Sequence, residues 1–194
     1  WQANNGAANL VSDPDFVTPS MWGSGDSGCT SYITNEQAHA GSWCLKMTHT
    51  TSSTSPYICL TRNPNGTPKM YIPCKPGDAF IVTGWARAKV GNAGNQGVRI
   101  YAGWNGNGQS ETGAAATVTT DIPSNAWVQI PPTTLVCPAN RDKVRFLVQT
   151  IYGTGSSAAN DVYYFDQIVI REVTASSATN QALYNANTPG STVD

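Results

Sequence analysis

Six side chains in the middle of the sequence have the chemistry of a sugar-binding surface: two aromatic rings, three guanidinium groups and one amide. They belong to Trp85, Tyr101, Arg87, Arg99, Arg145 and Gln149. An aromatic ring packs against the C–H face of a sugar, and guanidinium and amide groups hydrogen-bond its hydroxyls. We therefore expect these residues to form a ligand site if they share one exposed surface. The alternative is that a helix, a loop or a partner domain covers that surface.

Three segments with alternating apolar and polar residues decide where these side chains point. Successive side chains of a β-strand point to opposite faces. The alternation predicts an inward set made of Phe80, Val82, Gly84, Ala86, Val98, Ile100, Ala102, Val144, Phe146 and Val148. The six sugar-binding candidates then point outward, and we expect them on neighbouring strands, on the non-core face of one sheet.

The other aromatic residues divide into two groups. Trp22, Tyr32 and Trp104 lie in or beside expected loops, which makes them the second-choice ligand site, at an end of the fold. We expect the remaining ones to pack in the core or at a sheet edge, namely Trp43, Trp127, Tyr164 and Phe165.

Motifs of the common enzyme classes are weak or absent. Gly25-Asp26-Ser27-Gly28 copies the sequence around the nucleophile of chymotrypsin-like proteases, but His39 and His49 follow it instead of preceding it. A loop is the favoured interpretation. Glu111, in the polar segment 105–113, is the best candidate for a glycoside-cleaving acid, and a solvated loop charge is the more frequent role of such a residue. The sequence thus predicts no catalytic residues.

The elements that position the candidates are β-strands, because short alternating runs bounded by turn residues recur and no window has helical spacing. The expected strands are 9–11, 42–48, 57–61, 70–72, 79–89, 97–103, 116–120, 127–135, 143–150 and 162–172. Strands of this number and spacing are typical of an all-β fold, a two-sheet antiparallel β-sandwich of the jelly-roll type.

Length and composition favour one domain. The chain has 194 residues, of which 40% are hydrophobic and only 12% charged. Residues 9–173 hold every expected strand and form the predicted sandwich. We expect residues 1–8 to be a linker or leader, and residues 174–194, which show no periodicity, to be a flexible or loosely docked tail.

Charge and hydropathy argue against two classes of partner. The net charge is -1, so no general field attracts nucleic acid. No stretch approaches the roughly 18 to 20 apolar residues that span a bilayer, so we expect no membrane insertion. The first residues lack the basic and apolar regions of a signal peptide.

The five cysteines leave at least one thiol unpaired whatever the others do. Cys59, Cys74 and Cys137 each lie in an apolar, strand-like run, which favours buried free thiols over bridges. No Cys-x-x-Cys pair occurs, so a zinc cluster is not expected.

The order of several motifs resembles carbohydrate-binding modules of the family 4, 9 and 22 type, which have a galactose-binding-like jelly roll. Segment 9–16 followed by Trp22 is similar to their first strand, and segment 38–47 to their His-Ser-Gly-Ser, aromatic, Leu-Lys stretch. Segment 75–88 resembles their Pro-Gly turn and central strand, 125–129 a later strand that opens with Trp, and 163–170 the closing aromatic-Asp-Asp strand.

The resemblance also implies a structural calcium ion, with two departures from the family pattern. Val17 stands where a Glu ligand is frequent, and the closing Asp pair is Asp166-Gln167. Alternation places Asp166 inward, and an inward carboxylate needs a cation or hydrogen-bond donors. The expected ligands are Asp166, Asp13 or Asp15, and carbonyls near Gly41 and Ser42. The alternative is an Asp166 carboxylate that accepts backbone N–H bonds.

Together these patterns predict a non-catalytic carbohydrate-binding module that directs a larger protein to a polysaccharide or a bacterial cell-envelope glycan. The expected location is extracellular, in a secreted multimodular enzyme or on a virion surface. The Ala-, Gly- and Thr-rich composition favours a phage tail protein. A purely structural or assembly sandwich without sugar binding is the alternative, and a glycan-cleaving enzyme is less favoured.

Overall fold

The structure is a computed structural model that describes residues 8–22, 28–51, 56–62, 71–92, 96–106, 108–118, 122, 126–152 and 158–173. Residues 25–27 of the protease-like motif, residues 1–7 of the expected leader and the whole expected tail, 174–194, lie outside the described residues. The described chain forms one short 3-10 turn, η1 (Pro19–Met21), and ten β-strands. The strands are β1 (Cys29–Thr34), β2 (Cys44–His49), β3 (Tyr57–Cys59), β4 (Ile72–Pro73), β5 (Ala79–Ala88), β6 (Gln96–Gly106), β7 (Gln109–Val118), β8 (Val128–Val136), β9 (Lys143–Tyr152) and β10 (Val162–Val173).

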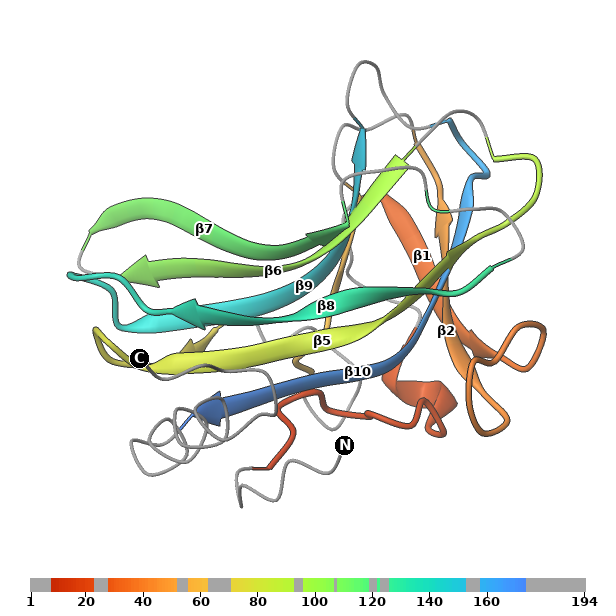
Figure 1. Ribbon diagram of the computed structural model, residues 1–194. Coiled ribbons are helices and arrows are strands. Elements are labelled where there is room, and N and C mark those ends of the chain that lie inside the picture. Colours follow the sequence, from red (N-terminus) through yellow and green to blue (C-terminus); the bar gives the residue numbers. More distant parts are fainter. Residues whose placement is uncertain are drawn as a thin grey trace, which may run out of the picture.

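The strands form two antiparallel sheets that pack face to face (Figure 1). One sheet has the order β1-β2-β10-β5-β8, and the other has the order β3-β9-β6-β7 with β4 also paired to β9. The prediction of an all-β, two-sheet sandwich is therefore confirmed. The described residues contain no helix that is long and apolar enough to cross a membrane.

The core lies between the sheets, and the alternation predicted its members correctly. All ten residues expected to point inward are buried. All five cysteines are also buried. Strand β1 was not among the strands predicted from the sequence. It is an edge strand paired only to β2, and its inward positions include the small polar Ser31, so its apolar alternation is faint. Conversely, residues 9–11 form no strand, although Leu10 N–H donates to the Ile170 carbonyl.

A bulge in β10 changes which residues face the core. Tyr163 and Phe165 belong to the main core, and so do Ile168 and Ile170. Odd-numbered residues therefore face the core before the bulge, and even-numbered residues face it after the bulge. The backbone of Gln167 has a φ of 48°, which accommodates this shift. The expectation that Asp166 points into the core was therefore wrong. Its carboxylate is on the outer side of the sheet, under the loop that joins β1 to β2.

Candidate functional site

The six predicted sugar-binding residues all point away from the core, but they lie on two different sheets. Trp85 and Arg87 are on β5, in the β1-β2-β10-β5-β8 sheet. Arg99 and Tyr101 are on β6, and Arg145 and Gln149 are on β9, in the opposite sheet. The expectation of one shared face was therefore wrong, because alternation gives the side of a strand but not the sheet to which the strand belongs.

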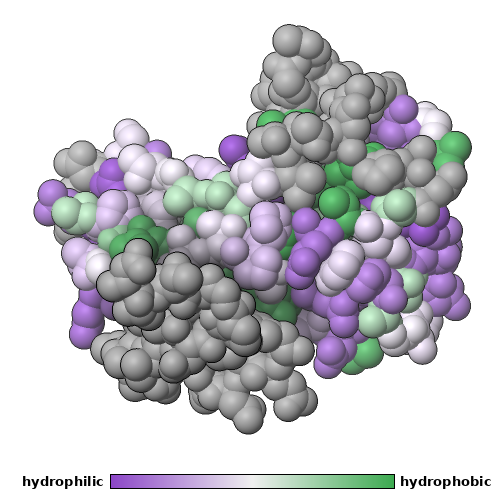
Figure 2. Space-filling model, viewed as in Figure 1, coloured by the Kyte–Doolittle hydropathy of each residue, from purple (hydrophilic) through white to green (hydrophobic). Residues whose placement is uncertain are grey.

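Strands β6 and β9 carry four of the six residues, β6 adds one more, and neighbouring segments add a further three. We call this outer surface the polar-aromatic face. Its residues are Tyr57, Tyr71, Arg99, Tyr101, Asn105, Glu111, Arg145 and Gln149. In Figure 1 strands β6 and β9 rise toward one end of the sandwich, as do β5 and β10 below them. Figure 2 shows a dip in the molecular surface above β6 and β7.

A carboxylate–guanidinium pair organises one half of the face. Arg145 Nη2 donates to Glu111 Oε1 at 2.8 Å, and Arg145 Nε lies 2.8 Å from Oε2 without hydrogen-bond geometry. The Tyr71 hydroxyl donates to Oε2 at 2.9 Å and accepts from the Asn105 amide at 3.0 Å. The Arg145 guanidinium also lies 5.4 Å from the centre of the Tyr57 ring. Four strands, β3, β6, β7 and β9, and the segment before β4 thus contribute to one connected network.

A second pair organises the other half. Arg99 and Gln149 are cross-strand partners on β6 and β9, and Arg99 Nε donates to Gln149 Oε1 at 2.8 Å. The guanidinium carbon of Arg99 lies 4.8 Å from the centre of the Tyr101 ring. Because the Gln149 side chain is buried, its amide is a fixed anchor for the Arg99 side chain.

Partial burial and neighbouring charges shift several pKa values on this face. Burial raises the pKa of the Tyr71 phenol, and the Glu111 carboxylate raises it further. Burial and the Glu111 charge likewise raise the pKa of Tyr101. Burial lowers the pKa of the Arg145 guanidinium, but the hydrogen bond and charge of Glu111 more than offset this, and the pKa stays above its usual value. The phenols are therefore neutral and Arg145 is charged at physiological pH, so the face offers both donors and a fixed cation.

The sequence analysis missed Tyr57, Tyr71 and Asn105 as site residues and placed Glu111 in a loop. Glu111 instead lies within β7 and is paired with Arg145. A signal for this was present: segment 105–108 reads Asn-Gly-Asn-Gly, which favours a tight hairpin. Pairing the chain outward from such a turn extends the expected strand 116–120 back to Gln109, and alternation then places Glu111 beside Gly113 on the outer face.

Trp85 lies on the other sheet and is half covered by the chain's own β1–β2 loop. The His39 ring stacks on Trp85 with ring centres 4.0 Å apart, and the Trp127 ring packs edge-on against His39 at 5.4 Å. His39 Nδ1 lies 2.9 Å from the Gln167 side-chain oxygen. A loop thus covers part of the outer surface of this sheet, which is the alternative that the sequence analysis named for the predicted binding surface.

The second-choice aromatic site does not form. Trp22 and Trp104 are buried in the main core, and only Tyr32 of the three is exposed. Trp104 was expected in a loop, but β6 continues past it to Gly106. Trp127, Tyr164 and Phe165 pack as expected, whereas Trp43 is 39% exposed and not an edge or core residue.

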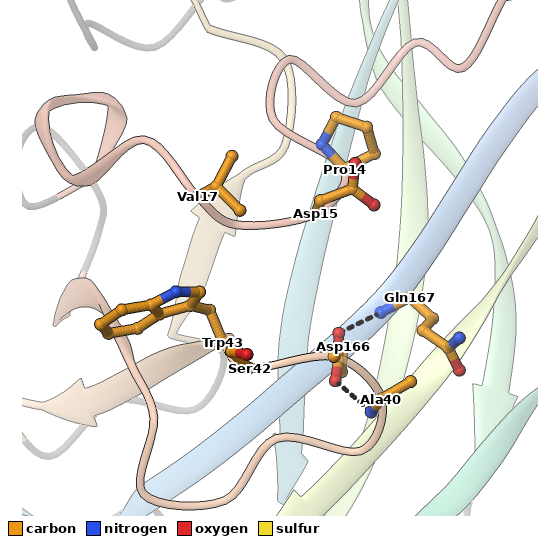
Figure 3. A pocket seen from close by; sticks show the side chains of 9 residues that line it. Pro14, Asp15, Val17, Ala40, Ser42, Trp43, Asp166 and Gln167 are labelled. Atoms are coloured by element: carbon orange, nitrogen blue, oxygen red, sulfur yellow. Dashed lines mark hydrogen bonds between the residues drawn. The ribbon is translucent and has the colours of Figure 1, made fainter.

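Four of the five expected calcium ligands lie around a surface pocket of about 450 Å³ (Figure 3). Asp15, Gly41, Ser42 and Asp166 line it. Asp13 does not, because its carboxylate accepts bonds from the Val17 and Thr18 amides and the Trp22 indole. The described residues include no group of three or more His, Cys, Asp or Glu side chains placed to hold a metal ion.

Hydrogen bonds already satisfy the Asp166 carboxylate. Oδ2 accepts from the backbone N–H groups of His39 and Ala40 at 2.8 and 3.1 Å, and Oδ1 accepts from that of Gln167 at 2.7 Å. Such amide donors stabilise a buried carboxylate without a cation. The residues present therefore fit the hydrogen-bonded alternative at least as well as a calcium site.

The sequence matches no protein-family model and no curated protein. Solved structures match its fold. The CBM22-1 xylan-binding domain of Paenibacillus barcinonensis Xyn10C has a TM-score of 0.58 and 19% identity, over 89% of this chain and 99% of that one. A family 16 carbohydrate-binding module has a TM-score of 0.54 and 14% identity, over 84% and 99%. The chain therefore shares the β-sandwich fold of these modules.

One further match comes from a phage protein. The enzymatically active domain of tailspike protein 4 of bacteriophage CBA120 has a TM-score of 0.53 and 14% identity. The match covers 85% of this chain and 21% of that one, so the shared sandwich is a small part of the tailspike.

Proposed function

We propose that this protein is a non-catalytic carbohydrate-binding module that binds a polysaccharide or a bacterial cell-envelope glycan through the polar-aromatic face. The observation that carries the proposal is the fixed array on that face, in which Tyr57, Tyr71 and Tyr101 supply rings beside the guanidinium groups of Arg99 and Arg145. Rings for the C–H face of a sugar and fork-like donors for its hydroxyls are the two things that sugar recognition requires.

A binding role suits this face better than catalysis. Glycoside hydrolysis ordinarily needs two carboxyl groups on either side of the scissile bond. Among the described residues, strands β3, β4, β6, β7 and β9 contribute one carboxylate, Glu111, and its two oxygens are engaged by Arg145 and Tyr71.

The expected affinity is weak, which supports a role as one part of a larger protein. Each ring contributes roughly 0.5 to 1.5 kcal/mol, and each polar contact about as much, before association costs are subtracted. Affinities on the order of micromolar to millimolar follow for a single site. Repeated copies or a linked catalytic domain compensate for such weakness. We propose an extracellular parent, either a secreted enzyme or a virion tail protein.

A structural sandwich in a phage tail, without sugar binding, is the second candidate, and the fold match to the tailspike domain supports it. Exposure of the polar-aromatic face separates the two candidates. An assembly domain would cover that face with another chain of the same particle, whereas a binding module leaves it open.

Titration of the purified protein with a panel of soluble polysaccharides, neutral and acidic, tests the proposal. We expect at least one to bind, and we expect Tyr101→Ala to weaken that binding about 3- to 10-fold because it removes one stacking ring. Trp85→Ala is the matched control, since it removes an outward aromatic residue from the opposite sheet. Failure of every glycan to bind, or equal losses in both variants, would refute the proposed site.

A further inference from the structure

The sheet that carries the polar-aromatic face has more positively than negatively charged residues. Strands β3, β4, β6, β7 and β9 carry three cations and one anion, and all four side chains lie on the outer face: Arg99, Lys143, Arg145 and Glu111. Glu111 is paired with Arg145. Asp142 lies just beyond the sheet, beside Gly106 at the start of β9. The outer face of this sheet therefore carries an excess of positive charge, although the net charge of the whole chain is -1.

Arg99 differs from Arg145 in how its charge is used. Both guanidinium groups lie over tyrosine rings, and each is fixed by a hydrogen bond to a side chain on another strand of the same sheet. The partner of Arg145 is a carboxylate, whereas the partner of Arg99 is the neutral amide of Gln149. That bond uses Nε, and among the described residues Arg99 makes no ion pair. Its two terminal nitrogens keep their donors for a ligand.

The chemistry of this group points to an oxyanion. A guanidinium group is a planar fork that binds carboxylate or phosphate oxygens in pairs, and such charge-assisted bonds are stronger than bonds to neutral hydroxyls. Stacking on Tyr101 and the bond to Gln149 hold the fork in one orientation before a ligand arrives. A neutral sugar would leave that charge without a counter-charge.

We propose that Arg99 makes the polar-aromatic face selective for glycans that carry oxyanion groups, carboxylates or phosphates, over neutral glycans. This inference rests on the proposed function and narrows its ligand class. Arg99 is then a specificity-determining residue, with Tyr101 as the ring beneath it. Arg145 and Glu111 form the neighbouring, charge-compensated part of the same face.

Matched pairs of polysaccharides test the proposal. Polygalacturonic acid and fully methyl-esterified polygalacturonate differ in the free carboxylate, and a poly(glycerol phosphate) teichoic acid provides the phosphate source. We expect at least about tenfold tighter binding to one of the two acidic polymers than to the ester, because an Arg–oxyanion contact adds a charge-assisted bond. Whichever acidic polymer binds shows whether the recognised oxyanion is a carboxylate or a phosphate. The preference should weaken as NaCl rises from about 20 mM to about 200 mM, since exposed charges are screened.

Two variants assign the selectivity. Arg99→Gln should reduce binding to the acidic polymer about 10- to 100-fold, and Arg99→Lys should have a smaller effect because it keeps the charge but loses the fork. Arg87→Gln is the control, with the same change of net charge on the other sheet. Melting curves check that each variant is folded, and if Arg99→Gln is not, Arg99→Lys alone decides.

The outcomes separate this inference from the proposed function. Equal binding of acidic and neutral polymers, or unchanged selectivity in both Arg99 variants, overturns the inference and leaves the carbohydrate-binding proposal standing. Absence of binding to any neutral or acidic glycan overturns both.

Discussion

Gly103 and Gly113 are cross-strand partners on β6 and β7, and neither position has room for a Cβ atom on the outer face. A Cβ at Gly103 would lie 2.8 Å from the carboxyl carbon of Glu111, and one at Gly113 would overlap the Tyr101 ring. The Glu111 and Tyr101 side chains therefore pack directly against the backbone of Gly103 and Gly113, respectively. The missing side chains, and not the backbone conformation, explain why glycine is needed here.

Replacing Gly113 with Ala should displace the Tyr101 ring and weaken glycan binding about 3- to 10-fold. Stability should change by less than about 2 kcal/mol, because the clash is partly offset by the higher strand preference of Ala. Titration and thermal melting measure the two quantities. If the effect acts through Tyr101, Gly113→Ala will add little to Tyr101→Ala in a double-mutant cycle. Additive losses would show that Gly113 acts by another route.

Trp85→Ala should behave in the opposite way. Its ring is half buried and stacked on His39, so we expect a loss of stability of about 1 to 3 kcal/mol from lost packing. Binding at the polar-aromatic face should be unchanged. A large loss of affinity with an unchanged melting temperature would instead give the Trp85 surface a ligand site of its own.

His49 should make the protein less stable in mild acid. Burial lowers the pKa of its imidazole to about 4, with the Asp161 charge opposing this, and the ring stacks on Tyr163. The unfolded chain binds a proton on this imidazole near pH 6.5, whereas the folded protein does so only near pH 4. The free energy of unfolding is therefore highest above about pH 6.5 and falls as the pH drops toward 4. Near pH 5 the loss is about 2 kcal/mol. His49→Gln should flatten the curve of unfolding free energy against pH between about 6.5 and 4, and a variant curve parallel to the wild type would contradict this role.

Calcium remains a prediction, and Asp15 and Asp166 would be its ligands. If calcium binds the folded state alone, added Ca²⁺ should raise the melting temperature and excess EDTA should lower it. Melting curves with and without EDTA, together with metal analysis of the purified protein, measure this. A melting temperature that does not respond, with no metal present, would leave Asp166 as a carboxylate held by the amides of His39, Ala40 and Gln167.

Local patterns predicted the fold well and the site only in part. Alternation correctly assigned Phe80, Val82 and Ala86 to the core, because burial of one face is a property of a single strand. It could not assign Trp85 and Tyr101 to different sheets, since sheet membership depends on pairings between distant segments. Asp166 was misplaced for another reason. A one-residue bulge reverses every later side chain of β10, and nothing in the local pattern marks it.

The Arg145–Glu111–Tyr71 network has a thermodynamic consequence for recognition. Fixing a long side chain when a ligand arrives costs roughly 0.5 to 1.5 kcal/mol of conformational entropy. Here these side chains are already immobilised by one another, so that loss is incurred during folding and not during binding. A preorganised template gains affinity for the ligand whose spacing it matches, and it has little ability to adapt to others. If the polar-aromatic face binds glycans as proposed, it should discriminate sharply among glycans of similar composition but different linkage geometry.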